Sequence, residues 1–206
     1  MLDGFKLILY IMSSKNNETR NRILDAAWKL LEAGQGQGVR MSDIAKQAGI
    51  SRQALYLHFS KRTELLIATT RYIDEVKGVD ERLSLSRSAI SGVARLDAYI
   101  DAWSDYIPEV YGVAKALLSM RDSDEAAAMA WDDRMRAFRE GCEAAIEALH
   151  RDGMLVSEHS IQQATDILWT LLSVRNWEQF TVDCGWSLDK YNETTKLLAH
   201  RIFVAN

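Results

Sequence analysis

Residues 44–59 read IAKQAGISRQALYLHF, and this stretch predicts two short helices joined by a tight turn. Helices that cross steeply need apolar side chains where they face each other and a small side chain where they pass closest. Four apolar residues occupy the facing positions, namely Ile44, Ala48, Ile50 and Leu55. Ala45 is the small residue, and Gly49 lies where the turn needs a residue that tolerates φ > 0. Because all of these positions agree, the stretch indicates a helix-turn-helix.

The second helix of this motif has two faces of different chemistry. Leu55 and Phe59 are one turn apart, so we expect both to point inward. Arg52, Gln53 and Tyr56 are then left on the outer face. Arginine pairs with guanine, and glutamine with adenine, in the major groove of DNA. This face therefore predicts a contact with DNA bases.

Residues at the two ends of the same helix indicate contact with a phosphate backbone. The helix N-terminus at Ser51 offers backbone N–H groups and a positive dipole end to a phosphate oxygen. Lys61 and Arg62 open the next helix, where a cation is unfavourable for the helix dipole. We therefore expect both basic residues to face phosphates.

Charge is unevenly distributed along the chain. Residues 13–62 hold nine Lys or Arg and four Asp or Glu, a net charge of +5. Residues 63–206 hold fifteen and twenty-four, a net charge of −9. The pattern favours a polyanion-binding module attached to a part that does not bind polyanions. Chance variation over fifty residues is the alternative explanation.

The whole chain has one proline, Pro108, and no run of alternating β-branched residues, so we predict an all-α protein. The expected helices cover residues 19–32, 42–48, 51–59, 60–77, 93–106, 109–120, 123–151, 160–182 and 187–203. Thr19 is the expected N-cap of the first helix, and GQGQG (34–38) is expected to end it. Residues 1–18 are interpreted as an extension and mobile arm, in which residues 2–12 are either disordered, untranslated or a short extra helix.

Several other classes of protein find no support in the sequence. The apolar run at residues 7–12 is too short to cross a membrane. Cys142 and Cys184 form no short-spaced pair, which favours free thiols in a cytoplasmic protein. GQGQG lacks the preceding strand and the Lys-Ser/Thr pair of a phosphate-binding loop, and the histidines lack metal-ligand spacing. We therefore expect no metal and no cofactor.

The run IAKQAGISRQALYLHFSKRTELL (44–66), preceded by TRNRILDAAWKLL (19–31), resembles the DNA-binding domain of the TetR family of bacterial transcriptional regulators. The match is specific over residues 19–66 and looser over the rest of the chain. The resemblance implies homodimers that bind palindromic operators, usually as repressors. It also implies that a small molecule entering the C-terminal domain releases the DNA.

Eight DNA-binding residues follow when the family pattern is transferred to this sequence. Those expected in the recognition helix are Ser51, Arg52, Gln53 and Tyr56. His58 is expected near a phosphate and Lys61 against the backbone, while Arg40 and Ser42 are weaker phosphate candidates. Many relatives have threonines at positions 40 and 41, where this chain has Arg40 and Met41. The threonine cap of that helix is therefore missing here, and Ser42 is expected to cap the helix in its place. For His58 and Tyr56, a packing role is the alternative.

We expect three parts: the extension and arm at 1–18, a helix-turn-helix domain at 19–66, and a helical domain at 67–206, which the resemblance implies binds a ligand and dimerises. The Ser- and Gly-rich residues 78–92 are the expected linker region. Aromatic and methionine side chains of the last domain are mostly expected in its core. Six are candidates for lining a ligand site: Trp103, Tyr106, Tyr111, Trp131, Met135 and Trp169. Nearby acids are a weak indication of an organic cation, and these are Asp101, Asp105, Asp132 and Asp133. Solvated faces are the alternative for these acids, and a neutral, acidic or acyl-type ligand remains open.

The last two long helices are candidates for a four-helix interface with a second copy of the chain. The residues expected there are Ile161, Thr165, Leu168, Leu172, Tyr191, Thr194, Leu198 and Ile202. The alternative is that these helices close the core of a single chain.

The function predicted from the sequence is a ligand-responsive DNA-binding transcriptional regulator, most simply a homodimeric repressor on a palindromic operator. Its partners would be double-stranded DNA, a small-molecule effector and a second copy of the chain, without a membrane. An all-α enzyme is one alternative, but the sequence shows no nucleophile-base pair, metal spacing or nucleotide loop. A helical protein-interaction module is the other.

Overall fold

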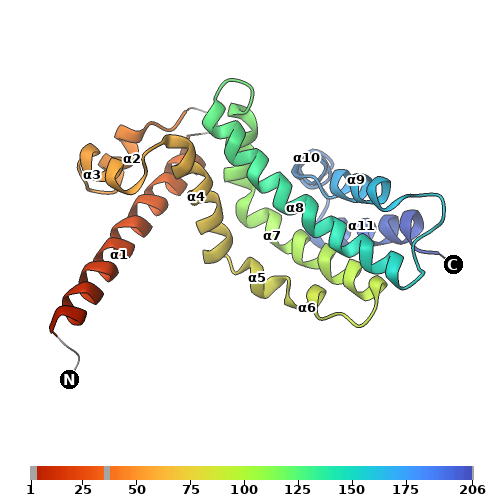
Figure 1. Cartoon of the computed structure of the whole chain (residues 1–206). Coiled ribbons are helices and arrows are strands. Elements are labelled where there is room, and N and C mark those ends of the chain that lie inside the picture. The colour runs from red at the N-terminus through yellow and green to blue at the C-terminus, as the bar shows by residue number, and fades with distance from the viewer. Residues whose placement is uncertain (1–3, 35–37, 206) are drawn as a thin grey trace. The chain divides into compact units, whose positions relative to one another are not determined.

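The computed structural model describes residues 4–34 and 38–205 (Figure 1). Within these residues every regular element is helical, and the only β-type pairing is an isolated bridge between Leu155 and Val204. The predicted all-α fold, with an N-terminal helix-turn-helix and a C-terminal helical part, is confirmed. The elements are α1 (Gly4–Ala33), α2 (Met41–Gln47), α3 (Arg52–His58), α4 (Arg62–Val76), α5 (Val79–Arg82), α6 (Ser84–Arg87), α7 (Gly92–Met120), α8 (Glu125–Arg151), α9 (Ile161–Leu171), α10 (Val174–Glu178), the π-helical turn η1 (Gln179–Asp183) and α11 (Leu188–Phe203).

The chain groups into two compact units. The N-terminal unit contains the described residues up to Ile73 together with Gly112–Trp131. The C-terminal unit contains residues 74–111 and 132–205. Consequently α4, α7 and α8 each contribute residues to both units. The region expected as a linker at 78–92 contains the one-turn helices α5 and α6.

Three predicted helix boundaries are wrong. Helix α1 begins at Gly4 and passes through Thr19, because residues 5–33 contain neither glycine nor proline to stop it. Residues 4–18 are therefore helical here, while residues 1–3 and residues 35–37 of GQGQG lie outside the described part of the chain.

Helix α7 runs unbroken through Pro108, where the sequence predicted two helices. The proline removes only the hydrogen bond to the carbonyl of Ser104. Tyr106 and Ile107, just before the proline, are buried, so tertiary packing sustains the helix. In contrast, the helix predicted at 160–182 is interrupted after Leu171.

The interruption has a local cause in side chains that compete with the helix for backbone groups. The Ser173 hydroxyl accepts a hydrogen bond from the Asn176 N–H at 3.3 Å and so caps α10. The Asn176 side chain donates to the Thr170 carbonyl at 2.7 Å. Helices α9 and α10 are therefore separate elements.

In the N-terminal unit, α2 and α3 pack beside α1 to form a small core (Figure 1). Its fully or nearly buried apolar side chains are Ile23, Leu24, Ala26, Ala27, Leu31, Ile44, Ala45, Leu55, Phe59, Leu65 and Leu66. The apolar positions that predicted the helix-turn-helix are thus mostly core positions.

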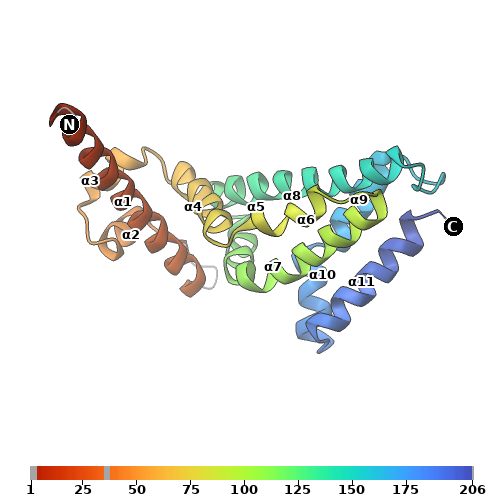
Figure 2. The ribbon, with the colours of Figure 1, turned by 90° about the horizontal axis from the view of Figure 1, so that it is seen from below.

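In the C-terminal unit, one hydrophobic core joins α7, α8, α9 and α11. Figure 2 shows α11 alongside α7. A row of polar pairs connects the two helices. The His200 Nε2 lies 2.7 Å from Asp97, and the Asn192 amide donates to Asp101 at 2.8 Å. Lys196 forms an ion pair with the same Asp101 carboxylate.

Half of the residues predicted for a dimer interface lie in the core of the single chain. The buried ones are Thr165, Leu168, Leu172 and Tyr191, each with no exposed surface. They face the inside of α9 and α11 and are not available to a second chain, so this part of the prediction is wrong. Ile161, Thr194, Leu198 and Ile202 are half-buried.

No helix in the described part of the chain combines the length and apolar content that a membrane crossing requires.

Candidate nucleic-acid interface

The turn between α2 and α3 is set by backbone hydrogen bonds and one glycine. Gly49 has φ of 67°, as the sequence predicted for this position. The Gly49 N–H donates to the Lys46 carbonyl at 3.2 Å, and the Ile50 N–H donates to the Ala45 carbonyl at 3.0 Å. This pair of bonds is a Schellman motif, which satisfies the last carbonyls of α2 and turns the chain toward α3.

Helix α3 is seated by two apolar side chains and capped by a serine. Leu55 and Phe59 have no exposed surface, and Ile44 of α2 is equally buried. The Ser51 hydroxyl accepts a hydrogen bond from the Ala54 N–H at 3.1 Å. A Ser at the N-cap typically stabilises a helix by about 1 kcal/mol. Ser51 therefore has a structural role in addition to any contact with DNA.

The residues predicted to face outward from α3 do so. Arg52, Gln53 and Tyr56 are exposed, and the Arg52 guanidinium lies 5.6 Å from the centroid of the Tyr56 ring. Leu57, to which the sequence analysis gave no role, is 85% exposed on the same face. The sequence carried a signal for it, because Leu57 is one turn after Gln53 and not one turn from Phe59.

Two arginines of α1 hold the C-terminal ends of α3 and α2. Arg20 donates to the His58 carbonyl at 3.4 Å, and its guanidinium lies 4.2 Å from the centroid of the Phe59 ring. Arg22 donates to the Ala48 carbonyl at 3.3 Å. Cations at helix C-termini interact favourably with the last carbonyls and the dipole. Neither arginine was predicted from the sequence to have this role. His58 itself is half-buried.

The predicted cap of α2 by Ser42 is wrong. Arg40 occupies the N-cap position and makes no capping hydrogen bond through its side chain. Ser42 lies inside the first turn, where its hydroxyl donates to the Asp43 carboxylate at 3.4 Å. A side chain in the first turn cannot replace the N-cap residue, but the Asp43 charge is favourable there. Arg40 and Ser42 are both exposed.

Lys61 and Arg62 differ in their surroundings. Lys61 is exposed, as expected for a residue that meets phosphates. Arg62 instead donates to the Val39 carbonyl at 2.6 Å and pairs with Asp124 at 2.6 Å. The prediction that Arg62 faces phosphate is therefore wrong, because its guanidinium is committed inside the N-terminal unit.

Asp124 connects this arginine to the start of α8. Its carboxylate accepts hydrogen bonds from the N–H groups of Ala126 and Ala127 at 3.1 and 3.2 Å. The hydrogen bond from Arg62, helped by these N–H groups, lowers the pKa of Asp124 below its usual 3.8. The pair thus joins Val39, which precedes the N-cap of α2, the first turn of α4 and the first turn of α8.

Residues 44–63, which include the turn and α3, contain no Asp or Glu and four Lys or Arg. Of the four, Arg62 is neutralised by Asp124. Lys46, Arg52 and Lys61 are exposed and leave this surface positive. Its chemistry suits a polyanion that also offers hydrogen-bonding edges.

The six candidate ligand residues do not form one group. Trp131 belongs to the N-terminal unit, whereas the other five belong to the C-terminal unit. Trp103, Met135 and Trp169 pack against the main core of that unit. Trp103 stacks on Phe138 with centroids 4.0 Å apart and donates to the Leu172 carbonyl at 2.6 Å.

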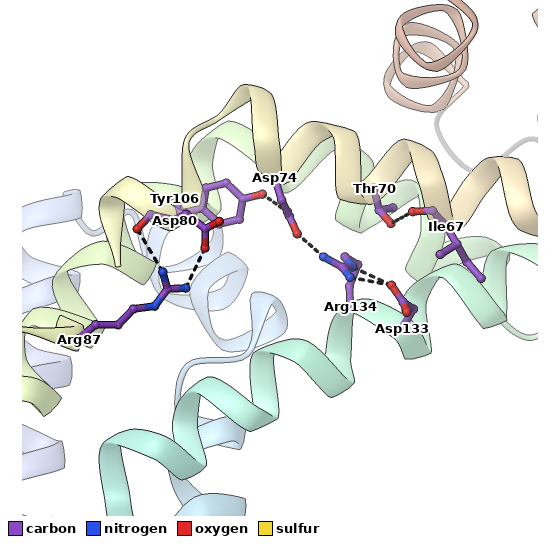
Figure 3. A network of polar contacts seen from close by, with 8 residues as sticks. All are labelled: Ile67, Thr70, Asp74, Asp80, Arg87, Tyr106, Asp133 and Arg134. Atoms are coloured by element: carbon purple, nitrogen blue, oxygen red, sulfur yellow. Dashed lines mark hydrogen bonds and ion pairs between the residues drawn. The ribbon is translucent and has the colours of Figure 1, made fainter. Parts of the chain in front are cut away.

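Tyr106 belongs to a polar network that links three helices of the C-terminal unit (Figure 3). Its hydroxyl donates to Asp74 of α4, and the other oxygen of Asp74 pairs with Arg134 of α8. Arg134 also pairs with Asp133 at 2.6 Å. Burial and the neighbouring Asp74 raise the pKa of the Tyr106 hydroxyl, so it stays protonated and donates.

A second aromatic cluster surrounds Tyr111 in the C-terminal unit. The Tyr111 hydroxyl donates to Glu178, and its ring centroid lies 5.0 Å from that of Trp177. Ile107, Trp177 and Tyr191 form its buried centre, with Trp103 and Phe180 packed around it. Trp177 and Phe180 were not predicted, because the break before α10 that places them was not visible in the sequence.

Three buried groups in or beside this cluster have no hydrogen-bond partner. They are the hydroxyl of Ser104, which is 2% exposed, the hydroxyl of Tyr191, which has no exposed surface, and the indole N–H of Trp177, which is 7% exposed. Ser104, Ile107 and Tyr111 share one face of α7 by their spacing. Since buried polar groups are normally hydrogen-bonded, their gathering around one aromatic cluster indicates a ligand site.

The acids predicted to favour an organic cation are not available for that role. Asp101 pairs with Lys196 and Asn192, and Asp133 pairs with Arg134. Asp105 and Asp132 are exposed to solvent. In the described residues, no three His, Cys, Asp or Glu side chains are grouped so that they could hold a metal ion. Both cysteines are free thiols, Cys142 buried and Cys184 exposed.

Comparison with known proteins gives a consistent result. The family model described as bacterial regulatory proteins, tetR family, matches residues 23–69. The chain is 30% identical over 186 residues to the HTH-type transcriptional regulator CymR of Pseudomonas putida, covering 84% of this chain and 82% of that protein. It is 36% identical over 64 residues to the nucleoid occlusion factor SlmA of Marinomonas sp. (strain MWYL1), spanning 31% of this chain and 32% of that protein.

A solved structure shares the fold along nearly the whole chain. A transcriptional regulator from Saccharomonospora viridis, in complex with choline, matches with a TM-score of 0.72 at 18% identity. The match covers 92% of this chain and 100% of the other.

The Arg62–Asp124 pair predicts a pH-dependent contribution to stability. We expect Asp124→Asn to destabilise the protein by about 1–3 kcal/mol at pH 7, because the amide keeps the cap and loses the charge. A carboxyl group whose pKa is lowered by folding stabilises the folded state above its unfolded pKa and loses this effect as the pH falls through the folded pKa. The difference in unfolding free energy between the wild type and Asp124→Asn, measured by urea denaturation, should therefore persist at pH 5 and shrink below pH 3.8. A difference that does not vary with pH would contradict the charged pairing.

Proposed function

The chain belongs to the TetR family of bacterial regulatory proteins, and we propose that it represses transcription by binding a palindromic operator as a homodimer that a small molecule releases. The observation that carries the proposal is the surface of α3. Exposed Arg52, Gln53 and Tyr56 lie there on a seven-residue helix with a buried seat, in a stretch without any carboxylate.

In this proposal α3 enters the major groove. Arg52 and Gln53 hydrogen-bond base edges, and Tyr56 contacts a base or phosphate beside them. Lys61, at the start of α4, meets the phosphate backbone, and exposed Arg40 and Ser42 are further phosphate contacts. His58 contributes at the edge of this surface, since it is half-buried.

A homodimer would place two copies of α3 about 34–36 Å apart, which matches one turn of DNA. We propose that the outer surfaces of α9 and α11 form its interface. Half-buried Thr194 and Leu198 lie next to Leu197, which is 50% exposed on α11. An isologous interface there would bury these side chains against their own symmetry mates.

The proposed effector site is the aromatic cluster of the C-terminal unit around Tyr111 and Trp177. An apolar compound with a carbonyl or carboxylate oxygen could accept from the unpartnered Trp177 N–H. An organic cation is less suitable, because the nearest acids are already paired or exposed. Choline, bound by the Saccharomonospora viridis protein, is therefore a useful negative probe.

Effector and operator would oppose each other through helices that both units share. Helices α4, α7 and α8 have residues in each unit, and Tyr106 and Arg134 hold Asp74 of α4 inside the C-terminal unit. A compound that favours a different arrangement of α7 would change the contacts that Tyr106 and Arg134 make with Asp74 of α4. By linkage, operator and effector would then weaken each other's binding by the same factor.

Operator affinity should depend steeply on salt, with Lys61 as one of its sources. In a dimer, Lys61→Ala removes two phosphate contacts, so the slope of log K against log salt should become less steep by about 1.8. Duplexes selected from a random library and titrated by fluorescence anisotropy provide the measurement. Lys190→Ala, which removes an exposed lysine of the C-terminal unit, should leave the slope unchanged. A salt-independent affinity would contradict DNA binding by this surface.

The dimer interface can be tested by a charge at an exposed position. Leu197→Glu would bring two carboxylates together at the proposed symmetric interface, so the chain should become a monomer in light scattering and lose most of its operator affinity. Leu85→Glu adds the same charge at a leucine of α6 that is 74% exposed, and should have no effect. A Leu197→Glu protein that remains dimeric would exclude this face.

Trp177→Phe tests the effector site by removing one N–H and keeping an aromatic ring. A panel of apolar carbonyl and carboxylate compounds is screened for release of the operator, with choline as the cationic comparison. The variant should bind an active compound about three to ten times more weakly, the effect of one lost hydrogen bond, with unchanged operator affinity in its absence. Equal sensitivity of both proteins would place the effector elsewhere.

A further inference from the structure

Leu57 differs sharply in exposure from the other leucine of α3. It is 85% exposed, whereas Leu55 on the same helix has no exposed surface. Leu57 neither seats α3 nor contacts the core, so folding does not explain a large apolar side chain at this position. Its exposed surface can only be buried by something that approaches α3 from outside.

The position of Leu57 identifies the chemistry of what approaches. One helical turn separates Leu57 from Gln53, and Tyr56 is adjacent and 39% exposed. Both neighbours belong to the face proposed to enter the major groove. Residues 44–63 contain exposed Lys46, Arg52 and Lys61 and no Asp or Glu, which favours a polyanion over a second apolar protein surface.

We propose that Leu57 recognises thymine in the operator by packing against its C5-methyl group. This inference rests on the proposed function, because it requires α3 to lie in the major groove. Thymine presents the one methyl group of the four bases there, and apolar side chains make contact with it. Leu57 is thus a specificity-determining residue that contacts a methyl group, whereas its neighbour Gln53 hydrogen-bonds a base edge.

The helix geometry limits where that thymine lies. Four residues separate Gln53 from Leu57, which is about 6 Å along the helix axis. Successive base pairs are about 3.4 Å apart, so the thymine should lie within about two base pairs of the position read by Gln53. In a palindrome it should occur once in each half-site.

Deoxyuridine provides the decisive probe, since it differs from thymidine only by the absence of that methyl group. A duplex is selected with the wild-type protein, and each thymine is replaced in turn by deoxyuridine. At one symmetric pair of positions, wild-type affinity should fall by about fourfold per half-site, the value expected for one buried methyl group. Leu57→Ala should bind the two duplexes equally at that position.

Two controls separate the methyl contact from other effects. Leu85→Ala shortens another exposed leucine, on α6, and should discriminate thymine from deoxyuridine as the wild type does. At the same position, 5-methylcytosine should bind better than cytosine by a similar factor to wild type but not to Leu57→Ala. Unfolding curves of Leu57→Ala should match the wild type, because the side chain is exposed.

Failure of this inference is distinguishable from failure of the proposed function. A protein that selects no sequence from the library overturns both. A protein that selects an operator but binds its thymine and deoxyuridine forms equally at every position overturns only the role of Leu57. Discrimination that survives in Leu57→Ala assigns the methyl contact to another side chain and also overturns it.

Discussion

The burial of Leu55 and Phe59 is the contact on which the DNA-binding surface depends. Helix α3 has seven residues, and a helix of this length is not stable alone in water. Its outward side chains are exposed and make no core contacts, so the two inward side chains must hold it. Arg20 strengthens the same seat by lying over the Phe59 ring and donating to the His58 carbonyl. Every outward side chain is positioned by this small inner contact.

The same helix explains which parts of the site the sequence could predict. Helical periodicity separates Leu55 and Phe59 from Arg52 and Gln53, because residues four apart in a helix lie on the same face. Gly49 was equally predictable, since the turn requires φ > 0 there. These inferences concern neighbours in sequence, and the structure bears them out.

Features that depend on distant residues were not predictable. Arg62 looked like a phosphate contact until the structure placed Asp124 beside it. Tyr191 looked like an interface residue because a buried face and a dimer face have the same apolar pattern. The continuity of α7 through Pro108 depends on burial of the adjacent side chains, which outweighs the local cost of the proline. In each case tertiary contacts overrule a local preference.

Helix α4 is held by one ion pair near each end, and these two pairs limit how the proposed regulation could work. Near its start Arg62 binds Asp124, and near its end Asp74 binds Arg134; each pair lies inside its own unit. The first pair is reinforced by the Val39 carbonyl and two N–H groups of α8, whereas the second also depends on the Tyr106 hydroxyl of α7. An effector at the proposed site beside α7 would therefore act more directly on the second pair. If the contacts of Arg62 persist, we expect regulation to change the spacing of two intact binding surfaces and not the surface itself.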